Sequence, residues 1–180
     1  MVSNQLQQLA QLARMQKNPS QPDWGAVRAA IGFAPPEDYC ELIEHYGAGL
    51  FNCYIQVHGP EANQRAFNLK QEGLYWDEFF RSEWERRPDT VPSRLHGRTF
   101  TIICWGGTED AVEFFWIAEP DKPSNQWEIA FQTISGNVWE FYRQSTVEVL
   151  LGLARGDLST SLIPPALPDE PVVYAPYIDL

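Results

Sequence analysis

The sequence predicts an α+β fold, with an antiparallel sheet and helices packed around it in a single domain. Two observations lead to this prediction. Apolar residues in the first 47 positions recur with the period of a helix, whereas residues 99–142 form short apolar runs separated by turn residues. We expect the domain to cover residues 23–158, with an N-terminal helix and linker over residues 1–22 and a proline-rich extension over residues 159–180 packed on it.

The first two helices are short and amphipathic. Apolar residues recur at helical spacing within residues 4–17. These residues are Leu6, Leu9 and Ala13. Asp23 is a typical N-cap residue and predicts a second helix that begins at Trp24 and ends at Gly32.

A third helix is predicted between Pro35-Pro36 and Gly47, since proline is favoured early and glycine late in helices. Its apolar residues form one stripe at positions i, i+3, i+4 and i+7. They are Tyr39, Leu42, Ile43 and Tyr46. Four acidic residues fall off this stripe, and they are Glu37, Asp38, Glu41 and Glu44.

The centre of the chain predicts one strand and one interrupted helix. Leu50–Val57 predicts a single strand, which Gly59-Pro60 ends. Residues 61–87 are helix-like, with a break at Gly73. Three aromatic residues share one face of this segment, namely Trp76, Phe80 and Trp84. Charged residues on another face can pair along the helix, namely Asp77, Arg81 and Glu85.

An antiparallel meander follows. Residues 99–105 and 112–118 flank a Gly-Gly-Thr-Glu-Asp turn, which predicts a hairpin. Residues 127–132 and 138–142 predict two further strands, joined near Ser135-Gly136-Asn137.

The last helix and the tail have local signals of their own. Ser145 and Glu148 form a capping box at the start of a helix that Gly156 ends. Five prolines after Ile163 exclude regular interior structure from the tail, so we expect it to pack in an extended form on the domain.

Charge restricts the classes of partner. The 180 residues include 13 Lys and Arg against 24 Asp and Glu, for a net charge of −11. This charge repels phosphate backbones and anionic membranes, so neither nucleic acid nor a membrane surface is expected as a direct partner. The same negative charge favours binding to a basic protein partner. The N-terminal residues lack the pattern of a secretory signal, and three widely spaced cysteines suit a reducing compartment, so we expect a cytoplasmic protein.

Catalytic and metal-binding patterns are weak. The three histidines, His45, His58 and His96, lie far apart, and no Cys or His residues have zinc-ligand spacing. Cys53 and Cys104 lie in apolar strand contexts and are expected to be buried as small hydrophobic residues. We therefore expect no cofactor, no metal, no small-molecule substrate and no enzymatic activity.

Several short motifs, in order, resemble the SUKH superfamily. They are Trp24 with Val27, Gly32 ahead of Pro36-Glu37-Asp38-Tyr39, His45-Tyr46-Gly47-Ala48-Gly49, Trp105 to Asp110, Phe115-Trp116, and Ser145 ahead of Val149-Leu150-Leu151 and Gly156. The resemblance covers residues 24–157 and implies an α+β domain that binds other proteins. Many bacterial members are similar in being immunity proteins that bind the toxin domain of a secreted polymorphic toxin. Fungal relatives are interaction scaffolds in cell-wall synthesis and signalling. The family has no agreed catalytic residues.

These observations lead to one main hypothesis and two alternatives. We expect an immunity protein that covers the basic cleft of a toxin domain. The expected contact residues lie in the hairpin turn, in the loop after the second hairpin strand and on the aromatic helix; they are Glu109, Asp110, Glu119, Asp121, Asp77 and Glu78. The same acidic residues could instead be solvated turns. One alternative is a scaffold whose tail binds partners, and the other is an enzyme whose catalytic group comes from distant residues.

Overall fold

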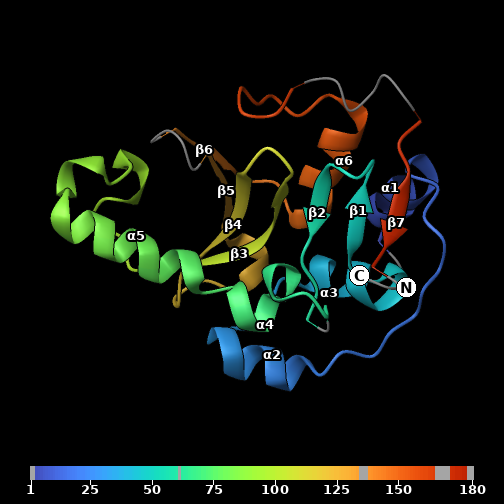
Figure 1. Cartoon of the computed structure of the whole chain (residues 1–180), viewed down its shortest axis with the longest axis horizontal. Coiled ribbons are helices and arrows are strands. Elements are labelled where there is room, and N and C mark those ends of the chain that lie inside the picture. Colours follow the sequence, from blue (N-terminus) through green and yellow to red (C-terminus); the bar gives the residue numbers. More distant parts are fainter. Residues whose placement is uncertain (1–2, 61, 134–137, 165–170, 178–180) are drawn as a thin grey trace.

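A computed structural model describes residues 3–60, 62–133, 138–164 and 171–177 of the chain (Figure 1). Within these ranges the strands form one sheet with the order β6-β5-β4-β3-β2-β1-β7, and every neighbouring pair is antiparallel. The strands are β1 (Gly49–Phe51), β2 (Ile55–Val57), β3 (Thr101–Thr108), β4 (Val112–Ala118), β5 (Glu128–Thr133), β6 (Trp139–Tyr142) and β7 (Tyr174–Pro176). The predicted α+β class is confirmed.

The helices begin and end close to the signals in the sequence. They are α1 (Asn4–Leu12), α2 (Trp24–Ile31), α3 (Glu37–Tyr46), α4 (Leu69–Glu72), α5 (Tyr75–Arg86) and α6 (Thr146–Arg155), with short 3-10 turns η1 (Arg65–Phe67), η2 (Pro88–Thr90), η3 (Ser93–Leu95) and η4 (Ser124–Gln126). The side chain of Asp23 accepts a hydrogen bond from the Ala26 N–H at the start of α2. Both hydrogen bonds of the Ser145–Glu148 capping box are present. These caps form as predicted because they depend only on residues adjacent in the chain.

Each face of the sheet carries its own apolar cluster. The larger cluster joins one face to α1, α3 and α6, and it includes the buried side chains of Trp105 and Trp116. The smaller cluster lies on the other face, where Phe80 of α5 packs on Phe115. Figure 1 shows α5 set apart from α1, α3 and α6 by the central strands. The aromatic stripe predicted for residues 61–87 is therefore the face by which α5 covers the sheet.

The prediction of a single strand over Leu50–Val57 is wrong, because this segment forms two strands, β1 and β2. Asn52 and Cys53 adopt left-handed backbone angles, with φ of 50° and 55°, and they reverse the chain between β1 and β2. Cys53 is consequently exposed at a turn, which corrects the expectation that it is buried. Asparagine tolerates the left-handed region better than most residues, but the apolar run around it concealed the turn.

The tail contains a strand that the prolines did not predict. Tyr174–Pro176 forms β7, which pairs with β1 at the edge of the sheet. Proline is compatible with an edge strand, because one row of backbone N–H groups has no strand partner there. These residues lie extended against β1, and Tyr174 is 4% exposed. The turn expected near Ser135-Gly136-Asn137 lies outside the described residues.

Candidate functional site

Glu109 and Asp110 lie in the turn between β3 and β4, and both are exposed, as the hairpin prediction requires. The turn is tied to the β1–β2 turn through Tyr54, whose hydroxyl donates to Asp110 Oδ2 at 2.9 Å and whose carbonyl accepts the Glu109 N–H at 3.0 Å. Burial, followed by this bond to Asp110, raises the pKa of Tyr54 to about 12. The turn therefore presents two carboxylates to solvent in a fixed geometry.

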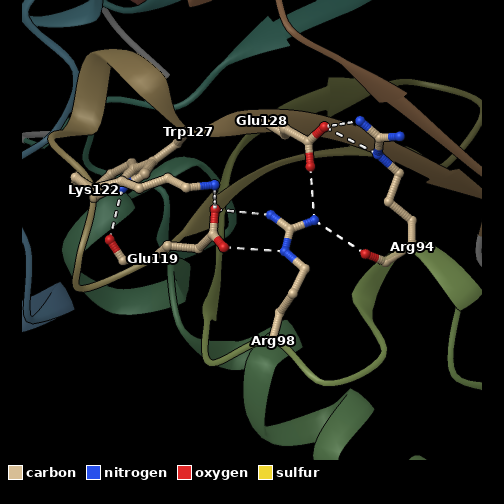
Figure 2. Close-up of polar contacts among 6 residues, drawn as sticks. All are labelled: Arg94, Arg98, Glu119, Lys122, Trp127 and Glu128. Atoms are coloured by element: carbon tan, nitrogen blue, oxygen red, sulfur yellow. Dashed lines mark hydrogen bonds and ion pairs between the residues drawn. The ribbon is translucent and has the colours of Figure 1, made fainter.

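Glu119 belongs to an ion-pair network (Figure 2). The Arg98 guanidinium lies 2.9 Å from Glu119 Oε2 and 2.7 Å from Glu128 Oε2, and Lys122 Nζ lies 2.5 Å from Glu119 Oε2. Arg94 contacts Glu128 from the other side. Although burial opposes the effect, the hydrogen bonds from Arg98 and Lys122 lower the pKa of Glu119. Its charge is thus balanced within the molecule, and it contributes little attraction toward a partner.

The two acidic segments predicted to bind a partner lie at opposite ends of β4. Glu109 and Asp110 precede this strand, and Glu119 and Asp121 follow it. The seven residues of β4 span about 23 Å, at about 3.3 Å per residue. Asp121 is exposed, in the loop before η4. The structure therefore separates the two predicted segments by the length of β4.

Asp77 and Glu78 differ in their surroundings. The carboxylate of Asp77 pairs with Arg81 at 2.7 Å and accepts the Ile102 N–H at 2.8 Å, which ties α5 to β3. Glu78 is exposed on the outer face of α5, beside Phe79, whose side chain is 40% exposed. Of these two residues, Glu78 is the one directed to solvent.

An acidic groove of about 590 Å³ runs along α3 and was not singled out from the sequence. It is lined by Ser3, Glu37, Asp38, Cys40, Glu41, Glu44, His45, Asn125 and Ser145, with no lysine or arginine among these residues. Asn125 belongs to η4, so the groove adjoins the loop that carries Asp121.

The carboxylates of the groove are held by uncharged donors. The Ser3 N–H lies 3.1 Å from both oxygens of Glu41, Trp24 Nε1 lies 2.7 Å from Glu44 Oε1, and the Val147 N–H lies 2.7 Å from Asp38 Oδ2. A neutral donor orients a carboxylate without cancelling its charge. The negative potential of the groove therefore reaches solvent, unlike that of the Glu119 network.

A sequence signal for the groove exists in the spacing of its acids. Glu37, Glu41 and Glu44 follow one another at intervals of four and three residues, which places them on one face of a helix. The same spacing is typical of a solvated helix face. What distinguishes this groove is the contribution of α1, η4 and the start of α6, which only the packing of distant segments supplies.

The described part of the chain contains no group of three or more His, Cys, Asp or Glu residues arranged to hold a metal ion. None of its helices combines the length and the apolar character needed to cross a membrane. No family model, curated protein or solved structure matches the chain. The resemblance to the SUKH superfamily accordingly stands on the sequence motifs alone.

Proposed function

We propose that the chain is a non-catalytic protein-binding domain, and that it acts as an immunity protein that neutralises a toxin by covering a basic surface of the toxin domain. The observation that carries the proposal is the groove along α3, where carboxylates from Glu37, Glu41 and Glu44 gather with no lysine or arginine among the lining residues. The SUKH-like motifs and the net charge of −11 support the same function.

The proposed mechanism is electrostatic attraction followed by steric cover. A toxin that acts on nucleic acid needs a basic cleft for the phosphates of its substrate. An acidic groove fits such a cleft and occupies the place of that substrate. Charge complementarity of this kind raises the rate of association more than the final affinity, and salt weakens it.

The first experiment is an affinity capture from the native cell, washed at low and high salt, with bound proteins identified by mass spectrometry. We expect one stoichiometric partner that has a basic domain, is toxic when expressed alone and is harmless when co-expressed with this chain. Several partners from wall synthesis or signalling, with no toxic member, would contradict the immunity role and favour a scaffold.

A charge-neutralising variant then tests the groove. Glu37→Gln, Glu41→Gln and Glu44→Gln together remove three charges, while each amide keeps an oxygen that can accept the existing hydrogen bonds. We expect the association rate constant for the partner, measured at low salt, to fall about tenfold or more.

The matched control removes three charges from exposed positions on and after α5, through Glu78→Gln, Glu85→Gln and Asp89→Asn. Net charge changes equally in both variants, so the control should lower the rate constant only about twofold. Equal losses in the two variants would show that net charge alone attracts the partner, and the groove would then lose its assigned role.

A further inference from the structure

A second pocket lies where β2 and β3 separate. β2 pairs with β3 only from Gly106 to Thr108, and the ladder is irregular at Trp105. Beyond this point the chain after β2 leaves the sheet, and Gly59 bridges to Asn68 instead. The α4–α5 junction takes the vacated place beside β3, since the Gly73 carbonyl accepts the Cys104 N–H at 2.9 Å. The opening between these segments has a volume of about 450 Å³.

The floor of this pocket is polar. It consists of Gln56, His58, Cys104 and Glu113, which come from β2, the residue after it, β3 and β4. Gln56 and Glu113 both pair with Gly107, so they lie on the same face of the sheet with a glycine between them. A Cβ at Gly107 would lie 3.1 Å from Glu113 Oε2, so the carboxyl group uses the space that this glycine leaves.

Burial also disfavours charge on the floor. Burial lowers the pKa of His58 to about 4 and raises the pKa of both Glu113 and Cys104. Cys104 Sγ lies 3.4 Å from Glu113 Oε2 and 4.0 Å from His58 Nδ1. A neutral imidazole beside a protonated thiol does not supply the thiolate that nucleophilic catalysis needs, so these groups point to binding rather than to reaction.

Aromatic rings form the walls. Phe67, Tyr75 and Trp76 line the pocket from η1 and the first turn of α5, and Tyr75 is 51% exposed. At the rim, Arg65 and Glu72 pair with each other. Within the described ranges, the side-chain amide of Gln56 makes no hydrogen bond, so its donor and acceptor are available to a ligand.

We propose that this pocket binds a neutral planar heterocycle of the nucleobase or nucleoside class, with its ring against Tyr75 and Trp76 and its polar edge toward Gln56 and Glu113. The volume lies within the range of about 300–1,000 Å³ that small-ligand pockets occupy. An amide and a carboxyl group together match the alternating donors and acceptors on the edge of a base. The net charge of −11 and the Arg65–Glu72 pair leave no favourable place for a phosphate, so a nucleoside is preferred over a nucleotide.

The inference is independent of the proposed toxin partner, and it differs from the expectation that no small molecule binds. The sequence alone does not indicate this pocket, because its four floor residues come from three segments that are spread over 58 positions of the chain.

The test is a ligand-observed NMR titration of the full chain with adenosine, guanosine, cytidine and uridine, and with the corresponding 5′-monophosphates. We expect at least one nucleoside to bind with a Kd of about 1 mM or tighter. Its monophosphate should bind at least about threefold more weakly. Absence of saturable binding by all four nucleosides would overturn the proposal, and a monophosphate that binds as tightly as its nucleoside would overturn the choice of a neutral ligand.

Two matched pairs of variants locate the site. Gln56→Ala should raise the Kd of the bound nucleoside about tenfold, whereas Gln71→Ala, an exposed glutamine on α4, should leave it unchanged. Tyr75→Ala should also raise the Kd about tenfold, whereas Phe79→Ala, one turn further along α5, should not. Equal binding by wild type, Gln56→Ala and Tyr75→Ala would place the ligand elsewhere and overturn the assignment.

Discussion

His58 shows how a single buried residue links pH to stability. It is 5% exposed, and the groups near it are the thiol of Cys104, the Phe67 ring and, at the same pocket, the carboxyl groups of Glu113 and Glu72 together with Arg65. Burial lowers its pKa from 6.5 to about 4. Between these two values the unfolded chain binds a proton at this site and the folded chain does not. The stability that the neutral His58 contributes is therefore complete above pH 6.5 and is lost as the pH falls toward 4.

Because of His58, we expect the free energy of unfolding to be about 2 kcal/mol lower at pH 5 than at pH 7. His58→Gln removes this titration, so its free energy of unfolding should depend less on pH over the same interval. Urea unfolding at the two pH values measures the difference. The matched control is His96→Gln at an exposed position, which should keep the wild-type dependence. Equal slopes for His58→Gln and wild type would show that His58 is not protonated selectively in the unfolded chain.

At the scale of elements, β7 joins the end of the tail to the sheet. The Tyr174 hydroxyl donates to the Gly47 carbonyl at 2.6 Å, its N–H donates to the Ala13 carbonyl at 2.9 Å, and its ring packs 4.7 Å from that of Phe51. These contacts join the tail to α1, the end of α3 and β1. A segment held in this way is poorly placed to act as a free interaction motif.

Adjacent residues of the tail provide a matched test. Tyr174→Ala removes a buried aromatic side chain and should lower the free energy of unfolding by about 3–5 kcal/mol. Val173 is 45% exposed, so Val173→Ala should change it by less than about 0.5 kcal/mol. Urea unfolding midpoints measure both. If Tyr174→Ala kept wild-type stability and nevertheless lost its partner, the tail would be an interaction segment and the scaffold alternative would gain support.

At the scale of the whole molecule, exposed acidic residues lie in two separate places, the groove along α3 and the turn between β3 and β4. The groove along α3 adjoins η4, which follows β4, whereas Glu109 and Asp110 lie in the turn before β4. In contrast, seven basic residues between Arg65 and Lys122 are engaged in ion pairs with Glu72, Asp77, Glu83, Glu119 and Glu128. The field outside the molecule thus depends on which carboxylates lack a cationic neighbour rather than on the number of acids along the chain.

Reversing the charge of the two turn residues distinguishes their contribution to partner binding from that of the groove. With Glu109→Lys and Asp110→Lys together, we expect the Kd for the captured partner to change by less than about threefold, because the groove along α3 supplies the attraction. Binding measured at low and high salt tests this expectation. A loss of tenfold or more, with the folded state intact by circular dichroism, would place the partner at the turn.

The local signals of the sequence determined most of the elements. The bounds of α2 and α3, the capping box of α6 and the β3–β4 hairpin follow from caps, periodicity and turn residues, which act between neighbours in the chain. A local signal was misleading where two conformations share one composition, as in the apolar run that contains the Asn52–Cys53 turn.

Only the tertiary structure decided which carboxylates lack a cationic neighbour and which polar groups lie in contact. Arg98 neutralises Glu119 from 21 positions away, and Cys104 lies beside His58 across 46 positions. Composition alone identified the protein as acidic and favoured a basic partner. It could not locate the acidic groove or the polar pocket, because both are assembled by contacts between segments whose separation along the chain carries no information about their distance in space.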